Sequence, residues 1–123
     1  MQIKALCWMG VKTEKFEEVS HFFQAVMGLH PIQQTSDLVA FQLPSHDRIE
    51  VFGPHGPNPH FPPHGVVCGF LVADIKQATQ ELAQAGVELV GSLQGDAAGG
   101  YAWQHFRGPD GNLYELTQDP SLS

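Results

Sequence analysis

Glu50 and Glu115 are the two side chains of this sequence whose type and setting best suit chemistry. Each stands between apolar or aromatic neighbours in a short run of β-forming residues, 48–52 for the first and 113–117 for the second. Because side chains alternate across a strand, each carboxylate faces away from those neighbours, either into a polar pocket or into solvent. In a pocket, two carboxylates can bind a metal ion or share a proton as an acid and base pair.

A second row of functional side chains precedes Glu115. Trp103 and His105 are two residues apart, so they share one face of a strand, and Tyr101 and Arg107 continue the same row. His105 is either a catalytic imidazole or a histidine satisfied by a neighbouring carbonyl group. Trp103 is either a wall of the pocket or part of the core.

The cysteines and the histidines of the proline-rich segment are weaker candidates for functional residues than Glu50, Glu115 and His105. Cys7 and Cys68 are too few for a disulfide framework and lack CxxC spacing, which favours free thiols in a reducing compartment and predicts a cytoplasmic protein. Next to Gly69, Cys68 resembles a small core residue more than a nucleophile. The proline-rich segment 53–65 contains His55, His60 and His64, but it lacks the rigidity that a metal site requires.

Composition excludes several classes of function. A chain of 123 residues with 42% hydrophobic residues predicts one compact domain. Thirteen acidic and six basic side chains give a formal charge of -7, which argues against a nucleic-acid partner. The apolar run at residues 5–11 is much shorter than a spanning helix and lacks the layout of a secretory signal, so we expect no membrane association.

Two helices must help to position these residues. Apolar side chains recur at helical spacing over residues 16–27, with Thr13 as the expected N-cap and Gly28 as the closing residue. The same spacing recurs over residues 75–83, with Asp74 as the N-cap and Gly86 as the stop.

Each helix follows one β-leaning run and precedes three shorter ones, which predicts an α+β fold of two tandem βαβββ modules. The expected strands cover residues 3–11, 31–35, 38–43, 48–52, 66–73, 87–90, 101–107 and 113–117. The turn signal at residues 109–112 predicts a hairpin between the last two strands. We expect one domain over residues 1–123, with module 1 at about 1–53, a connector at 54–64 and module 2 at about 65–118.

The stretch from Trp103 to Leu116 resembles the closing hairpin of the vicinal oxygen chelate superfamily, which includes glyoxalase, bleomycin-resistance proteins and extradiol dioxygenases. The end of the first helix, the strand at 48–52 and the segments at 72–74 and 86–87 fit the same family. The resemblance implies that the two modules curl a mixed sheet into a cup with the helices on its outer face.

Metal-dependent members of that family place four ligands in the cup, from the first and last strands of both modules. By position, the resemblance assigns these ligands to Glu50, Glu115, Leu6 and Cys68, with Cys7 replacing Leu6 if the alignment slips by one. Leucine cannot bind a metal, and thiolate is a poor ligand for a hard divalent ion. The usual four-ligand set is therefore absent or changed.

Two functions follow from the resemblance. The first is a lyase, isomerase or dioxygenase-type enzyme with one divalent ion on Glu50, Glu115 and Cys68, and with Glu50, Glu115 and His105 as catalytic groups. The second is a metal-free protein of the bleomycin-resistance type that binds or sequesters a small molecule. In both, the ligand would contact Leu6, Trp8, Phe52, Cys68, Phe70, Tyr101, Trp103 and Arg107. Short chains of this kind pair, so we also expect a homodimer.

Overall fold

The computed structural model describes residues 1–63 and 65–122, so the candidate ligand His64 lies outside the described residues. The chain divides into two compact units, one formed by Met1–Cys7 together with Cys68–Ser123 and the other by Trp8–Val67. No helix of the described part is long and apolar enough to cross a membrane. That the whole chain forms a single domain stays a prediction.

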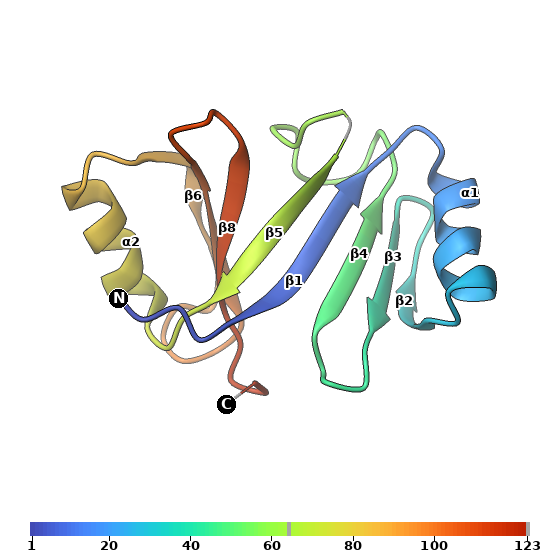
Figure 1. The fold of residues 1–123 in the computed structure, drawn as a ribbon, viewed down its shortest axis with the longest axis horizontal. Helices are drawn as coiled ribbons and strands as arrows, with labels where there is room; N and C mark the ends of the chain where they lie inside the picture. Colours follow the sequence, from blue (N-terminus) through green and yellow to red (C-terminus); the bar gives the residue numbers. More distant parts are fainter. Residues whose placement is uncertain (64, 123) are drawn as a thin grey trace. The chain divides into compact units, whose positions relative to one another are not determined.

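The unit Trp8–Val67 contains a four-stranded arrangement with one helical segment (Figure 1). Its strands lie in the order β2-β3-β4-β1, with β1 parallel to β4 and the other neighbours antiparallel. The bounds are β1 Ala5–Lys12, α1 Phe16–His21, the π-helical turn η1 Phe22–Val26, β2 His30–Gln34, β3 Leu38–Gln42 and β4 Arg48–Phe52.

The first helix differs from the expected one at its start and in its second half. Its N-cap is Lys15, whose side chain makes no capping bond, whereas the predicted cap Thr13 accepts a hydrogen bond from the Lys15 backbone N–H at 3.0 Å. From Phe22 on, the backbone is π-helical, and the Met27 N–H donates to the carbonyl of Phe22. Gly28 has a φ of 74°, which confirms it as the left-handed residue that closes the helix.

One face of this sheet packs against the helical segment. Val39, Phe41 and Val51 form the buried cluster, and Phe41 and Val51 are fully inaccessible to solvent. The partly buried residues packed against it are Phe16, Val19, Phe23, Leu29 and Ile49. Strand alternation therefore sends Glu50 to the opposite face from its neighbours Ile49 and Val51, as the sequence pattern predicted.

The second unit repeats the same plan. Its strands lie in the order β5-β8-β7-β6, with β5 parallel to β8 and the other pairs antiparallel. The bounds are β5 Val66–Leu71, α2 Ile75–Gln84, β6 Glu88–Gly95, β7 Ala102–Arg107 and β8 Leu113–Gln118. In each half a strand and a helix precede three strands, and the last of these lies parallel to the first. The predicted α+β class with two βαβββ repeats is thus confirmed.

Helix α2 is closed at both ends in the expected way. Asp74 is its N-cap and accepts a hydrogen bond from the Gln77 backbone N–H at 3.1 Å, and Gly86 follows the helix with a φ of 81°. The helix covers the sheet face formed by Ala102 and Leu116, and Figure 1 shows it beside the strands of its unit.

The strands near the candidate site are joined by tight, hydrogen-bonded turns. The hairpin between β7 and β8 forms at the predicted place, with Gly111 at a φ of 82° and the Gly108 N–H donating to the carbonyl of Asn112. Strand β6 runs to Gly95, five residues beyond the expected end. It contains a bulge between Val90 and Gln94, across which its pairing register with β7 shifts.

Candidate functional site

Glu115 lies in the middle of β8 between two strands. Its register partner on β7 is His105, and its partner on β5 is Gly69. The Nε2 atom of His105 lies 3.0 Å from Oε1 of Glu115, and Thr117 donates a hydrogen bond of 2.7 Å to Oε2. His105 is 4% exposed and Glu115 is 3% exposed. The structure therefore places two ionisable groups predicted from sequence in direct contact in a buried setting.

The contact between His105 and Glu115 has the distance of an ion pair. A buried carboxylate is costly unless charged or hydrogen-bonding partners surround it, and Thr117 and His105 supply those partners here. The pair is thus chemically suited to hold a proton or to receive one from a bound molecule.

The face that carries Glu115 also carries the predicted aromatic row. Trp103 lies opposite Thr117, two residues from His105 on the same strand, and its ring centroid is 5.7 Å from that of Tyr101. Trp103 and Tyr101 are both partly exposed. Trp103 thus lies next to the buried pair on its strand, Tyr101 packs against Trp103, and both rings could contact a ligand.

Arg107, the last member of the row, is already engaged at the end of the strand. Its Nε atom lies 3.5 Å from a carboxylate oxygen of Glu88, and its NH1 group donates a 3.0 Å hydrogen bond to the carbonyl of Gly111. The structure does not bring its guanidinium into contact with Glu115 among the bonds described.

Cys68 and Phe70 occupy the other face of β5. Phe70 packs against the buried cluster under α2, and its ring lies 6.1 Å from that of Tyr114. Because Gly69 is the residue opposite Glu115, its neighbours Cys68 and Phe70 point away from that carboxylate. The sequence resemblance assigned Cys68 to a ligand position by counting residues back from Asp74. The pairing of β5 with β8 instead places Gly69 opposite Glu115, so the Cys68 thiol lies on the other face of the sheet.

The equivalent site in the other unit is built around Glu50. This residue lies between Gly10 of β1 and Ala40 of β3. The indole Nε1 of Trp8 donates a hydrogen bond of 2.7 Å to its Oε1 atom. Trp8 is 7% exposed, so the indole fills the space next to this carboxylate. Trp8, predicted as a wall of the pocket, is thus a direct partner of Glu50.

Phe61 is a residue of this site that the sequence analysis missed. The ring centroids of Trp8 and Phe52 are 6.5 Å apart, and Phe61 packs edge-on against both, at 6.1 and 5.6 Å. Phe61 belongs to the predicted connector and is 5% exposed. A lone large aromatic residue in a proline-rich segment was the available signal, because such a side chain rarely stays in solvent.

The donor set does not fit the four-ligand metal site that the resemblance implies. Leu6 has no lone pair to offer and is 62% exposed, and Cys68 is on the face away from Glu115. Both oxygens of Glu115 and one oxygen of Glu50 already contact protein donors. The part of the chain that the structure describes contains no group of three or more His, Cys, Asp or Glu side chains able to hold a metal ion.

The exposed turn between β7 and β8 contains the carboxylate of Asp110, which is hydrogen-bonded to Tyr114. The Tyr114 hydroxyl donates a 2.8 Å hydrogen bond to Asp110, and this bond is the largest cause that lowers the pKa of Asp110 below its ordinary value of 3.8. The same bond raises the pKa of Tyr114 above 10.0. Both shifts favour the hydrogen-bonded pair of a carboxylate and a neutral phenol.

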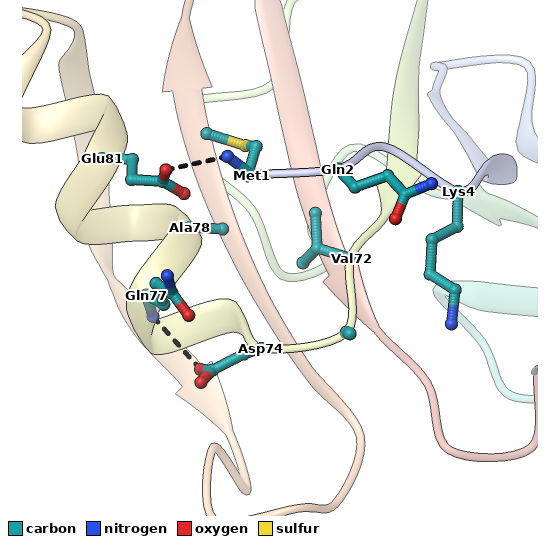
Figure 2. A pocket seen from close by; sticks show the side chains of 9 residues that line it. Met1, Gln2, Lys4, Val72, Asp74, Gln77, Ala78 and Glu81 are labelled. Atoms are coloured by element: carbon teal, nitrogen blue, oxygen red, sulfur yellow. Dashed lines mark hydrogen bonds and ion pairs between the residues drawn. The ribbon is translucent and has the colours of Figure 1, made fainter.

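Three cavities of about 290, 350 and 390 Å³ lie away from these side chains. The first is shown in Figure 2, where the amino group of Met1 meets Glu81 at 2.8 Å and Asp74 caps α2. None of the three is lined by Glu50, His105 or Glu115. We therefore base the candidate site on the side-chain contacts and not on cavity volume.

A family model matches residues 8–116 of this chain, and its description is Glyoxalase/Bleomycin resistance protein/Dioxygenase superfamily. No curated protein matches the sequence.

Solved structures match the fold across nearly the whole chain. A hypothetical protein of Bacillus halodurans is 18% identical with a TM-score of 0.70, and the match covers 94% of each chain. The Mn(II)-bound glyoxalase of Novosphingobium aromaticivorans is 17% identical with a TM-score of 0.75, over 96% of this chain and 40% of the other. A variant of the Streptomyces coelicolor methylmalonyl-CoA epimerase in complex with 2-nitronate-propionyl-CoA is 12% identical with a TM-score of 0.73, over 99% of both chains. Identities this low show a common fold and no more.

Proposed function

The chain belongs to the Glyoxalase/Bleomycin resistance protein/Dioxygenase superfamily, and from this premise we propose that it binds a small organic molecule beside His105 and Glu115. The observation that carries the proposal is the contact of 3.0 Å between these two buried side chains. Burial of an imidazole and a carboxylate is costly for the fold, which motivates a role for this pair beyond packing. The neighbouring rings of Trp103 and Tyr101 would supply apolar contact to the ligand.

We favour binding without a metal ion, because the oxygens of Glu115 already have protein partners and Cys68 lies on the other face. In this proposal the His105 imidazole and the Glu115 carboxylate hydrogen-bond the polar end of the ligand. Thr117 holds the carboxylate in place through its hydrogen bond to Oε2.

A second candidate function is proton transfer of the lyase or isomerase class. It is favoured by the adjacency of an imidazole and a carboxylate, since such a pair can take a proton from a carbon next to a carbonyl group and return it. The similar epimerase structure contains a carbonyl compound of the acyl-CoA type, and we propose this class as the first to test. A dioxygenase-type reaction would need a redox metal, for which the described donor set offers no fitting site.

The experiment compares Glu115→Gln with the wild type, using protein purified without a histidine tag. Calorimetry with 2-nitronate-propionyl-CoA and with bleomycin measures binding, and elemental analysis measures bound manganese, nickel and zinc. We expect Glu115→Gln to weaken ligand binding at least tenfold while the metal content stays near zero in both proteins. Glu81→Gln, a carboxylate of the same unit that pairs with the Met1 amino group and not with a residue of the candidate site, is the matched control and should bind as the wild type does.

Two results would contradict the proposal. Unchanged affinity in Glu115→Gln would show that the buried pair serves the fold alone. A stoichiometric metal in the wild type that Glu115→Gln removes would favour the metal-dependent enzyme instead. The expected cost of Glu115→Gln to stability is about 1–3 kcal/mol, so a thermal melt must first show that the variant is folded.

A further inference from the structure

We propose that the indole N–H of Trp8 takes the place of a metal ion as an electropositive partner of Glu50, so that Trp8 opposes metal binding at this glutamate. The proposal concerns the unit Trp8–Val67 alone and does not depend on which ligand the other unit binds. It begins from the 2.7 Å hydrogen bond between Nε1 of Trp8 and Oε1 of Glu50.

The position of Trp8 follows from the strand register. Gly10 lies directly opposite Glu50, and Trp8 is two residues earlier on β1, so its side chain shares the face of that carboxylate. A Cβ built on Gly10 would stand 2.7 Å from Cζ2 and 2.9 Å from Cζ3 of the Trp8 ring. The missing side chain of Gly10 is therefore the space that allows the indole to reach across to Glu50.

Packing holds the indole in that space. Trp8 is 7% exposed, and Phe52 and Phe61, which contact it, are 4% and 5% exposed. A ring so enclosed loses these contacts if it turns away, so the N–H group is held in place before any ion arrives. A metal ion would have to displace the indole in order to reach Oε1 along the same direction.

The chemistry of the indole determines whether Trp8 favours or opposes metal binding at Glu50. The Nε1–H group is a donor only and has no lone pair for a metal, unlike an imidazole nitrogen. Its hydrogen carries partial positive charge, so it stabilises the carboxylate as a cation would, and it repels a cation that approaches the same oxygen. Trp8 therefore stabilises the Glu50 carboxylate and at the same time blocks its Oε1 atom as a ligand.

The other unit satisfies its glutamate by a different route, which supports the assignment. Gly69 takes the place opposite Glu115 that Gly10 has opposite Glu50. Two residues before Gly69 stands Val67, which has no hydrogen-bonding group, and the nitrogen near Glu115 comes from His105 on β7 instead. Each closing-strand glutamate thus has a nitrogen near one of its oxygens, and of these two groups only the indole lacks the ability to become a metal ligand.

The test replaces the indole by two side chains of different chemistry and measures Zn(II) and Mn(II) binding by calorimetry. Trp8→His puts a potential ligand beside Glu50, whereas Trp8→Phe removes the N–H group and keeps an aromatic ring. We expect Zn(II) affinity at least tenfold higher in Trp8→Phe than in the wild type, because the N–H group that repels the ion is gone, and higher again in Trp8→His. The gain should vanish in the double variant Trp8→His/Glu50→Gln. Equal Zn(II) affinity in the wild type and in folded Trp8→Phe would overturn the proposal.

A fluorescence measurement tests the same point without changing Trp8. In the Trp103→Phe background Trp8 is the one remaining indole, because the chain has two tryptophans. Paramagnetic Mn(II) bound to Glu50 would quench its emission. We expect no saturable quenching up to millimolar Mn(II). Saturable quenching that Glu50→Gln abolishes would show that the ion binds beside the indole, and the proposal would then be rejected.

Discussion

The ring of Trp8 occupies the space that a side chain on Gly10 would need, as the 2.7 Å separation between Cζ2 and a Cβ built on Gly10 shows. Gly10→Ala should therefore force the indole away from Glu50 or strain the strand. We expect a loss of about 1–3 kcal/mol in the free energy of unfolding, which is the usual cost of overpacking a core. Urea denaturation followed by circular dichroism measures it.

A double-mutant cycle identifies the cause of that loss. If the clash with the indole is responsible, Gly10→Ala should cost less in a Trp8→Leu background than in the wild type, by at least half. An equal cost in both backgrounds would assign the effect to the strand backbone and not to the ring.

The hydrogen bond between Tyr114 and Asp110 should make stability fall at acidic pH. The pKa of Asp110 is lower in the folded protein than in the unfolded chain, so its contribution is present above the unfolded value of about 3.9 and is lost as pH falls through the folded value. Tyr114→Phe removes the largest cause of the shift. An NMR titration of the Asp110 carboxyl group should show its pKa rising toward 3.8. Tyr101→Phe is the control and should leave it unchanged.

The same bond has the opposite dependence at alkaline pH. Because the pKa of Tyr114 is raised, the contribution of its hydroxyl is present below the unfolded value of about 10 and is lost as pH rises through the folded value. Absorbance measured over an alkaline pH titration should show that Tyr114 ionises at a higher pH in the wild type than in Asp110→Asn. The reverse order would contradict the assigned bond.

Trp103→Ala tests whether this ring belongs to a ligand site or to the core. Trp103 is only partly buried, so we expect it to weaken binding of 2-nitronate-propionyl-CoA more than it lowers the melting temperature. Loss of a core tryptophan would cost about 3–5 kcal/mol of stability. A loss of that size with unchanged binding would assign the ring to the fold.

We expect the chain to form a homodimer in solution. Large apolar side chains at the end of the first helical segment are exposed, with Phe22 at 46%, Val26 at 69% and Met27 at 56%. Such side chains favour a self-complementary two-fold interface. Light scattering at micromolar concentration should give twice the mass of the chain, and Val26→Asp should reduce it. A monomer mass for the wild type would reject the dimer.

If the two units form one domain, they should unfold together. Each contains one tryptophan, Trp8 in one and Trp103 in the other, so Trp8→Phe and Trp103→Phe each leave a reporter for a single unit. We expect each variant's fluorescence transition in urea to coincide with its transition by circular dichroism. Separate midpoints would indicate two independently folding units.

The sequence alone determined the repeated order of elements and the turns that separate them. Capping and turn chemistry act within a few residues, so Asp74, Gly86 and the hairpin at Gly111 were predictable from their neighbours. Helical and strand periodicity placed Glu50 and Glu115 opposite their apolar neighbours for the same reason. The predicted start of the first helix was wrong, because its N-cap is Lys15, which has no side-chain cap, and Thr13 lies two residues before it.

Only the tertiary structure decided which side chains meet. The pairing of His105 with Glu115 depends on the register of β7 and β8, and that of Trp8 with Glu50 on the parallel register of β1 and β4. A shift of one residue would send every side chain of a strand to the other face, and local sequence does not encode this choice. The same register put Cys68 on the face away from Glu115, while long-range aromatic packing brought Phe61 from the proline-rich connector onto Trp8.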